Sequence, residues 1–259
     1  MSAHRAPDGA ALATALARFH ALDGDGTDPY LQGKTALASG QRELVQQWLK
    51  LRPHLEAPRV ALDWGCRHGV FAWLARQEFG DGPCLHGCDT FAAEAYPAMH
   101  AASGLHYTAL DDPWRLPYPD NAFDLILAGG TLEHVANDGA SLAELWRVLT
   151  PHGRLVLTHL PNAASASEWW SRRFAPAQAH PRRYRLPALR ERLLQLGFMP
   201  LAWGRHQLLP ATLPGAAQRP RLARGLDRAF ALNAPLEKLW PLNRLSATLW
   251  LVADKRLGF

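Results

Sequence analysis

The chain has 259 residues, 48% of them hydrophobic, so it is long enough for one domain with a substantial core. No run of 18 apolar residues occurs, and the N-terminal stretch lacks the basic end and apolar segment of a secretory signal. We therefore expect neither a membrane span nor export. The three cysteines favour reduced thiols in a cytoplasmic protein over a disulfide framework, and no metal site is expected.

The charge is distributed unevenly along the chain, although the formal net charge is only +5. Residues 1–160 hold 12 Lys and Arg against 18 Asp and Glu, whereas residues 161–259 hold 16 against 5. A basic last third favours an acidic partner, such as a phosphorylated or carboxylated substrate or an anionic membrane surface. A solvated, arginine-rich surface explains the same composition equally well. Nucleic acid is less favoured, because no recognisable DNA or RNA module is present.

Apolar periodicity predicts the elements of the first 160 residues. Helical spacing indicates helices over 11–22 and 41–51, then over 70–78 and 91–102, and from a cap at Asn137 or Asp138 to 149. Residues 150–153 should end that last helix as a turn, with proline and glycine. Strands are expected over 60–63, 84–88, 105–110, 123–128 and 154–159. Alternating strands and helices imply a parallel sheet with right-handed crossovers.

The last third is more irregular. Residues 161–185 are basic and aromatic, and we expect no regular element there. A helix over 186–196, a strand over 198–205, a loop over 207–219, one or two short helices over 220–242 and a strand over 246–252 follow. The predicted organisation is therefore a helical cover (1–55), a core (56–160), and the rest of the same domain with a basic lid and the last strands (161–259).

The irregular stretch carries two groups of side chains that allow more than one interpretation. Trp169 and Trp170 could form a wall over a substrate, anchor the chain at a membrane surface, or pack against the sheet. Neighbouring arginines could bind a phosphate or carboxylate, or simply be solvated: Arg172, Arg173, Arg182, Arg183 and Arg185. The sequence leaves these alternatives open.

The turn Asp63-Trp64-Gly65-Cys66-Arg67-His68-Gly69 joins the first core strand to the first core helix. A glycine turn before a helix lets backbone amides approach a ligand closely. Asp89 ends the next strand, where a carboxylate can accept hydrogen bonds from both hydroxyls of a ribose. A nicotinamide site uses the same parts, but this turn does not fit the spacing G-x-G-x-x-G.

The turn resembles the acid-x-G-x-G-x-G pattern of class I S-adenosylmethionine-dependent methyltransferases. Four later segments are similar to those of bacterial type 11-like methyltransferases: Leu116–Asp120, Phe123–Leu125, Leu132–His134 and Gly153–Leu157. The resemblance is strong over 59–160 and weaker over 186–203. It implies an α/β fold with a doubly wound, mostly parallel, seven-stranded Rossmann-like sheet and helices on both faces. The last strand would lie antiparallel beside the fifth, and S-adenosylmethionine would be the cofactor.

The resemblance also implies a set of cofactor-binding residues: Asp63, Gly65, Cys66, Gly69, Asp89, Thr90, Asp112, Ala128 and Gly129. Asp63 would stabilise the turn and the cofactor's ammonium group, although capping the helix is the simpler role. Asp89 would bind the ribose and Asp112 the adenine, with adjacent Asp111 as the rival. Ala128 and Gly129 would present carbonyls to the methionine part.

Two residues depart from the family pattern. Arg67 stands where the family has its middle glycine, so its side chain either crowds the cofactor or points out of the turn. Pro113 stands where the family often uses a backbone N–H toward adenine, and proline has none. A chain that kept the fold but lost cofactor binding would be a binding or scaffold partner, and this is the main alternative to an enzyme.

Methyl transfer is an in-line displacement, so the enzyme chiefly aligns the acceptor with the methyl group. An oxygen nucleophile can also need a base, and His134 and His159 follow the fourth and fifth strands. Both are candidate catalytic residues, and a structural role explains either equally well.

We expect a small-molecule or lipid-linked acceptor, an acidic one included, with O-methylation preferred. A membrane or nucleic-acid binder that uses the basic third can coexist with catalysis, and a nicotinamide oxidoreductase is least favoured.

Overall fold

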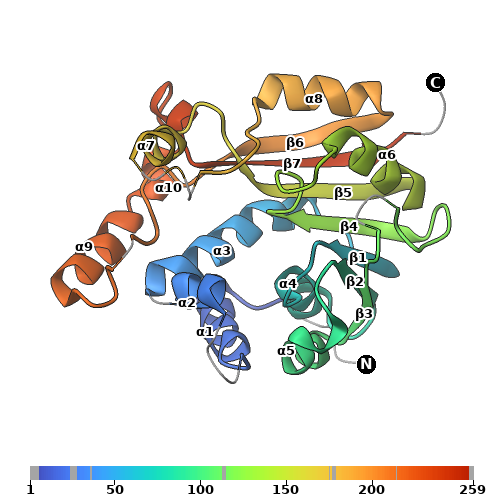
Figure 1. Cartoon of the computed structure of the whole chain (residues 1–259), viewed down its shortest axis with the longest axis horizontal. Helices are drawn as coiled ribbons and strands as arrows, with labels where there is room; N and C mark the ends of the chain where they lie inside the picture. Colours follow the sequence, from blue (N-terminus) through green and yellow to red (C-terminus); the bar gives the residue numbers. More distant parts are fainter. Residues whose placement is uncertain are drawn as a thin grey trace.

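A single seven-stranded sheet organises the described part of the chain in the computed structural model (Figure 1). The structure describes residues 6–23, 28–35, 37–112, 115–174, 176, 179–213 and 215–256. The strand order is β3-β2-β1-β4-β5-β7-β6. Strands β1 to β5 are parallel, and β7 is antiparallel to both β5 and β6. The strands are β1 (Val60–Trp64), β2 (Cys84–Asp89), β3 (Leu105–Ala109), β4 (Phe123–Gly129), β5 (Leu149–Pro161), β6 (Phe198–His206) and β7 (Thr248–Lys255).

Helices cover both faces of this sheet (Figure 1). On one face lie α6 (Asp138–Val148) and α8 (Leu186–Gln195), and on the other lie α1 (Gly9–His20), α3 (Ala38–Leu51), α4 (Val70–Phe79) and α5 (Pro97–Ser103). The remaining elements are α2 (Pro29–Thr35), η1 (Arg52–His54), η2 (Ala93–Ala95), α7 (Ala166–Phe174), α9 (Pro220–Phe230), α10 (Asn233–Leu236) and η4 (Leu242–Leu245). The predicted doubly wound fold and its antiparallel last strand are confirmed.

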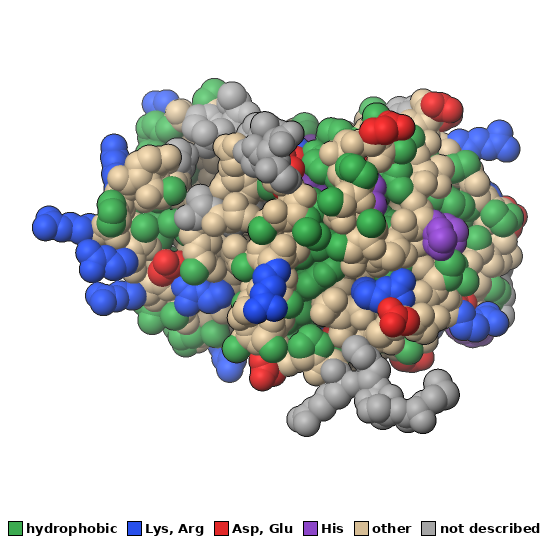
Figure 2. All heavy atoms as spheres, turned by 90° about the horizontal axis from the view of Figure 1, so that it is seen from below, with side chains coloured by type: hydrophobic (Ala, Val, Ile, Leu, Met, Phe, Trp, Pro, Cys, Tyr) green, Lys and Arg blue, Asp and Glu red, His purple; other side chains and the backbone are tan. Residues whose placement is uncertain are grey.

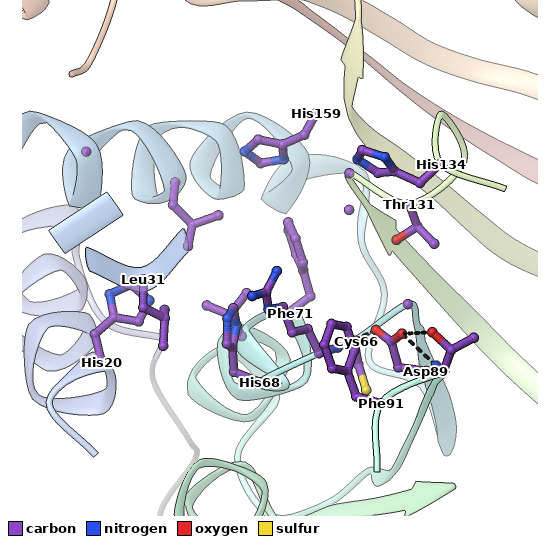
Figure 3. A pocket seen from close by; sticks show the side chains of 18 of the residues that line it. His20, Leu31, Cys66, His68, Phe71, Asp89, Phe91, Thr131, His134 and His159 are labelled. Carbon is purple, nitrogen blue, oxygen red and sulfur yellow. Dashed lines mark hydrogen bonds between the residues drawn. The ribbon is translucent and has the colours of Figure 1, made fainter. Parts of the chain in front are cut away.

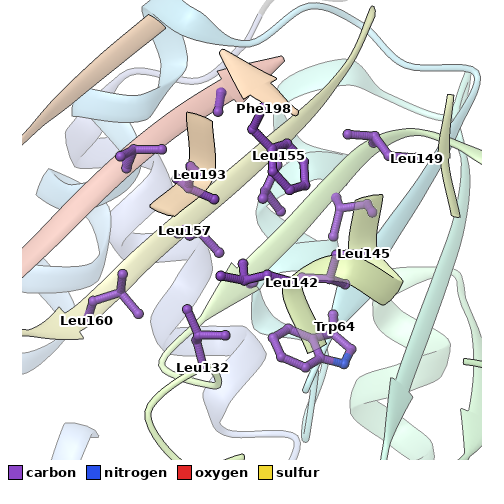
Figure 4. Close-up of a cluster of buried hydrophobic side chains, with 14 of the residues drawn as sticks. Trp64, Leu132, Leu142, Leu145, Leu149, Leu155, Leu157, Leu160, Leu193 and Phe198 are labelled. Atoms are coloured by element: carbon purple, nitrogen blue, oxygen red, sulfur yellow. The ribbon is translucent and has the colours of Figure 1, made fainter. Parts of the chain in front are cut away.

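The central strand β4 shows how the two cores form. Ile126 contributes to the core under α6 and α8, whereas Leu125 and Leu127 contribute to the core under α1, α3 and α4. All three are at most 1% exposed, because alternate side chains of a strand point to opposite faces. Burying each stabilises the fold by roughly 2 kcal/mol. Figure 4 shows the first core, where Leu142 and Leu145 of α6 meet Leu155 and Leu157 of β5.

Three predictions of elements were wrong. The helix expected over 91–102 is divided into η2 and α5, because Pro97 begins a new helix. Residues 150–153 lie within β5 and do not form a turn outside it, because Leu149 already pairs with Phe123 and Arg154 then pairs with Leu125. The four residues between form an irregularity in the strand, at which His152 has φ 61°. The stretch predicted to be irregular contains α7, whose start is stabilised by the Ser165 hydroxyl accepting a hydrogen bond from the Glu168 amide at 3.2 Å. This serine followed by a glutamate three residues later is a helix-start signal in the sequence.

The first and last parts of the chain contact each other through α3 and α9. Asp227 of α9 accepts hydrogen bonds from the Ser39 amide at 2.8 Å and from Arg42 Nη2 at 3.1 Å. The division of the chain at residues 55 and 160 stays a prediction. Within the residues described above, no helix is both long and apolar enough to cross a bilayer.

Candidate active site

A cavity of about 570 Å³ opens at the carboxyl edge of the parallel strands. Its floor comes from the residues that follow β1, β2 and β4, and α1 to α3 add side chains from the other side. The lining includes Gly65, Cys66, Arg67, His68, Asp89, Thr90, Phe91, Gly129, Gly130, Thr131, His134, His159 and His180, together with His20, Leu31, Gly40 and Leu44. Ligands bind at this edge of open α/β sheets, where strand tips lie side by side. In Figure 3, His134 and His159 lie on one side of the cavity and Cys66 and Asp89 on the other.

The glycine turn is fixed to the neighbouring strands. The amides of Gly65 and Cys66 donate to the Cys88 carbonyl at 2.8 and 3.2 Å. Gly65 has φ +70°, and a Cβ there would lie 2.2 Å from Thr131 Cγ2. Only glycine fits this backbone shape and close approach. The turn therefore presents backbone directly to the cavity.

Asp89 lies at the tip of β2 and is half-buried. One carboxylate oxygen accepts a hydrogen bond from the Arg67 amide at 2.8 Å, and the other accepts from the Thr90 amide at 2.7 Å. The Thr90 hydroxyl also donates to the second oxygen at 3.4 Å, a long contact that a ligand hydroxyl would replace. The first oxygen can accept a second hydrogen bond, and the residue lines the cavity. The geometry thus leaves Asp89 able to receive two hydroxyl groups from a ligand.

The Arg67 guanidinium is bound to the N-terminal part of the chain. Its Nη2 contacts both carboxylate oxygens of Asp28, at 2.9 and 2.8 Å, and its Nε lies 3.2 Å from Asp28 and from the Tyr96 hydroxyl. Tyr96 donates to Asp28 at 2.6 Å. Arg67 has φ 44°, a left-handed conformation that costs a non-glycine residue about 1–2 kcal/mol. The arginine therefore joins the glycine turn to the residue that precedes α2.

The other predicted cofactor residues differ in their access to the cavity. Asp63 is 3% exposed and accepts a hydrogen bond from the Ala72 amide at 2.9 Å, so it stabilises the first turn of α4. Burial raises the pKa of Asp63 to about 7, and the nearby Asp89 charge adds to the rise. Gly129 lines the cavity, and a Cβ there would lie 1.9 Å from Phe71 Cε2.

Asp63 does not line the cavity, and neither do three further predicted residues. Gly69 has φ +74° and begins α4, while Ala128 is 1% exposed within β4. Asp112 is an exposed residue after β3. Pro113, which departs from the family pattern at the adenine position, lies outside the described residues. Gly65, Cys66, Asp89, Thr90 and Gly129 are therefore the predicted cofactor residues that the fold brings together around one space.

His159 points into the cavity from an irregular position in β5. The β5–β7 register shifts between Leu157 and Leu160, and His159 has φ 58°. Such irregularities redirect a side chain and occur often beside active sites. Its Nε2 lies 3.1 Å from Oε1 of Glu43, a side chain of α3 that is only 1% exposed. Glu43 also lies 3.6 Å from His206 Nε2. The buried carboxylate beside Nε2 and the Thr158 hydroxyl, which lies 3.4 Å from Nδ1, thus hold the orientation of the His159 ring.

His134 occupies a more open position on the same side. Its side chain is 59% exposed, and burial together with the charge of His180 lowers its pKa. Its Nε2 lies 3.8 Å from Oε1 of Glu133, which is 2% exposed and whose pKa burial raises to about 7. His180, held by Glu168 of α7, completes this part of the lining. Both predicted histidines therefore face the cavity, but only His159 is held by a buried partner at hydrogen-bonding distance.

Sequence reasoning missed the partners of these groups. Asp28, Glu43, Glu133 and Glu168 are all buried acidic residues that contact a cavity-lining side chain. Burial of a carboxylate is not visible in a single sequence, and none of these four side chains was predicted to belong to the site. Among the described residues, no group of three or more His, Cys, Asp or Glu is arranged to hold a metal ion.

A family described as a methyltransferase domain matches residues 37–202. The chain belongs to this methyltransferase family. The class I, S-adenosylmethionine-dependent assignment made from the glycine turn is thereby confirmed, and a nicotinamide oxidoreductase is excluded.

Curated relatives match only parts of the chain. A demethylmenaquinone methyltransferase of Thermus thermophilus is 32% identical over 114 residues, which cover 41% of this chain and 49% of that one. A trans-aconitate 2-methyltransferase of Methylobacterium radiotolerans is 32% identical over 117 residues, covering 45% and 44%. The chain thus spans about half the length of these relatives.

Solved structures agree in fold. Phosphoethanolamine N-methyltransferase 2 of Haemonchus contortus, in complex with S-adenosylhomocysteine and phosphomonomethylethanolamine, aligns with a TM-score of 0.56 at 18% identity. The alignment covers 82% of this chain and 52% of that one. At this identity the similarity establishes the fold alone.

Proposed function

We propose that the protein transfers the methyl group of S-adenosylmethionine to an oxygen of a small-molecule or lipid-linked acceptor. The observation that carries the proposal is the cavity with two different sides. A glycine turn and Asp89 form one side, and His159, which lies against the buried Glu43, belongs to the other (Figure 3). A volume of about 570 Å³ lies within the usual range of ligand pockets.

The residues present fit the cofactor. Asp89 would accept hydrogen bonds from the two ribose hydroxyls, and the backbone at Gly65 and Cys66 would lie along the methionine part. Gly129 would contribute its carbonyl, while Asp63 would act by holding the start of α4. Ala128, Gly69 and Asp112 remain proposed contributors, Asp112 toward adenine. Bound S-adenosylmethionine supplies a methyl group whose bond to sulfur breaks as the bond to the acceptor oxygen forms.

The His159–Glu43 pair supports an oxygen acceptor. His159 Nδ1, beside the Thr158 hydroxyl at 3.4 Å, would take the proton that the acceptor hydroxyl loses, and the Glu43 carboxylate 3.1 Å from Nε2 would stabilise the charged ring. His134 lies on the same side and is the second candidate base. The cavity wall also carries His20, His68 and His180, and a wall rich in histidine suits a polar acceptor. Burial lowers the pKa of His68 to about 3, so this ring adds no positive charge.

The relatives support a small-molecule acceptor without selecting one. Their names specify demethylmenaquinone and trans-aconitate, which differ in the group that receives the methyl. The preference for oxygen therefore rests on the His159–Glu43 pair. A cytoplasmic location is part of the proposal, and it is supported by the three free thiols of Cys66, Cys84 and Cys88.

Calorimetric titration with S-adenosylmethionine and S-adenosylhomocysteine tests the cofactor site. We expect both to bind, and Asp89→Asn to weaken binding at least tenfold while the protein still melts cooperatively. Asp81→Asn is the matched control, since that side chain is fully exposed and outside the cavity. A folded protein that binds neither ligand would contradict the proposal and favour a scaffold role. Methyl incorporation from labelled cofactor into phenols, carboxylates and quinols then identifies the acceptor class.

A further inference from the structure

The segment 219–245 exposes apolar side chains of a kind that a monomeric protein normally buries. Trp240 is 77% exposed, and Leu232 and Leu239 are 54% and 53% exposed. Leu242 and Leu245 of η4 are also exposed. Leu232 lies between α9 and α10, Leu239 and Trp240 lie between α10 and η4, and the other two belong to η4. Several large apolar side chains exposed within one short segment mark an interaction surface.

The same segment carries outward positive charge. It contains six basic residues, of which Arg221, Arg224 and Arg228 lie on α9, against two acidic ones. Both acidic side chains face inward: Asp227 is bound to the Ser39 amide and Arg42, and Glu237 is bound to Lys50 and the Gln207 amide. The three arginines are exposed. Figure 2 shows Lys and Arg side chains gathered at the end of the molecule where α9 lies.

Helix α7 repeats this combination next to the cavity. Trp169, Trp170 and Phe174 are 66%, 53% and 55% exposed, and Arg172 and Arg173 lie beside them. The aromatic rings form one cluster, in which Trp170 lies 4.3 Å from Phe174 between ring centroids.

This helix is connected both to the segment 219–245 and to the cavity. The loop that leads into α7 is bound to η4, since Asn162 Nδ2 donates to the carbonyls of Arg244 at 2.9 Å and Ser246 at 2.8 Å. On its other side Glu168 of α7 holds His180, which lines the cavity.

We propose that the segment 219–245 and α7 form a surface that binds an anionic lipid bilayer. We call this surface the basic aromatic face. Tryptophan is favoured at the boundary between water and lipid, because its ring is apolar while its N–H stays hydrated. Arginines around such rings are attracted to anionic head groups. The positive charge of the face matches the anionic head groups, and its exposed aromatic and aliphatic side chains match the boundary between water and lipid.

Docking by the basic aromatic face goes beyond methyl transfer and does not require it. It would place α7, and with it the His180 side of the cavity, next to the bilayer. An acceptor carried in the lipid phase would then reach the cavity without crossing water. The inference also accounts for the uneven charge along the chain, because much of the positive charge of the last third lies on this face.

The test is cosedimentation of the full chain with vesicles, without cofactor, so that its outcome is independent of methyl transfer. Vesicles of phosphatidylcholine alone are compared with vesicles that contain phosphatidylglycerol. We expect binding to the anionic vesicles that weakens as salt is raised. Removing three charges by R221Q/R224Q/R228Q should weaken it by about 100-fold, since each basic residue near an anionic surface contributes about fivefold. The control R18Q/R59Q/R256Q removes three exposed arginines elsewhere and should retain binding.

A second variant separates apolar insertion from charge. L239S/W240S removes two exposed apolar side chains and should weaken binding at low salt and abolish it at high salt. Leu194→Ser is its control, because Leu194 is 44% exposed on α8, on the far face of the sheet. Thermal melting checks that every variant is folded.

Three outcomes would overturn the inference. The first is equal binding to neutral and anionic vesicles, or binding to neither. The second is a stable dimer in sedimentation velocity that L239S/W240S dissociates, because a second copy of the chain would then cover the face. The third is binding to single-stranded RNA that R221Q/R224Q/R228Q abolishes while vesicles do not bind.

Discussion

The two sides of the cavity are built in different ways. The side with Gly65 and Asp89 comes from one continuous strand-turn-helix-strand unit, whose hydrogen bonds join residues close in sequence. The side with His159 and His180 combines β5, α3, α7 and the loops around them. Under the proposed function, the cofactor would be bound by local geometry, whereas the acceptor would be bound by side chains assembled from distant segments. The following changes test this difference, beginning with the largest expected effect.

His159→Asn should lower turnover by about 100-fold or more, because the loss of a general base typically costs 10²–10⁴-fold. Asparagine tolerates the left-handed backbone that His159 adopts, so the strand should keep its shape. Steady-state kinetics with an identified acceptor should show a fall in kcat, while calorimetry shows unchanged cofactor affinity. Glu43→Gln should give a smaller fall in kcat.

His152→Asn is the matched control for this substitution. His152 is also a β5 histidine with positive φ, at 61°, but it does not line the cavity. The His152→Asn variant should have the same activity as the unaltered protein. If His159→Asn and His134→Gln both retain full activity, neither histidine acts as the base that the oxygen-acceptor proposal requires. That result would indicate an acceptor that needs no deprotonation.

Gly129→Ala should destabilise the protein by about 3 kcal/mol and remove cofactor binding, since a Cβ there would lie 1.9 Å from the Phe71 ring. Urea unfolding measures the first effect and calorimetry the second. Gly225→Ala is the control, because nothing lies within 4 Å of its Cβ position in α9. That variant should be more stable by about 1 kcal/mol, from helix propensity. Equal stability of the two variants would show that Phe71 moves aside freely.

The buried carboxyl of Glu133 should make stability depend on pH. Burial raises its pKa from 4.5 to about 7, so the folded chain holds this proton more tightly than the unfolded chain. The contribution is full below pH 4.5 and is lost as the pH rises through about 7. The side chain at position 133 in the Glu133→Gln variant stays neutral at every pH. The difference in free energy of unfolding between the variant and the unaltered protein should therefore shift in favour of the variant by on the order of 2 kcal/mol between low pH and about pH 8. Denaturant unfolding across this range measures the difference, and Glu191→Gln, exposed on α8, should show none.

Asp28→Asn should weaken the link between the glycine turn and the N-terminal helices. Asp28 is buried and contacts Arg67 through both oxygens, so its charge loss should cost about 1 kcal/mol. Hydrogen exchange should become faster in α1 and α2 and remain unchanged in β4. Asp81→Asn, which removes an exposed contact to Arg76, should change neither quantity. Unchanged exchange in Asp28→Asn would show that packing alone holds the helices.

Much of the fold could be predicted because its signals are local. The apolar run Leu125-Ile126-Leu127 indicates a strand buried on both faces, and Asn137 caps α6 through hydrogen bonds to the next residues. The failures have the opposite cause. The irregular start of β5 depends on pairing with β4, and α7 begins at a cap signal that its aromatic and basic composition obscured.

The sequence by itself determined the family, the seven strands in chain order, and the glycine turn and Asp89 that line one side of the cavity. A turn of Gly65 and Gly69 before α4, with Asp89 at the next strand tip, requires only short-range geometry that the residue types specify. Tertiary structure alone decided that Arg67 binds Asp28, that Glu43 supports His159, and that exposed tryptophans share a surface with arginines. These pairings depend on how distant elements pack, and packing places buried charges and exposed apolar groups in ways that no spacing along the chain reveals.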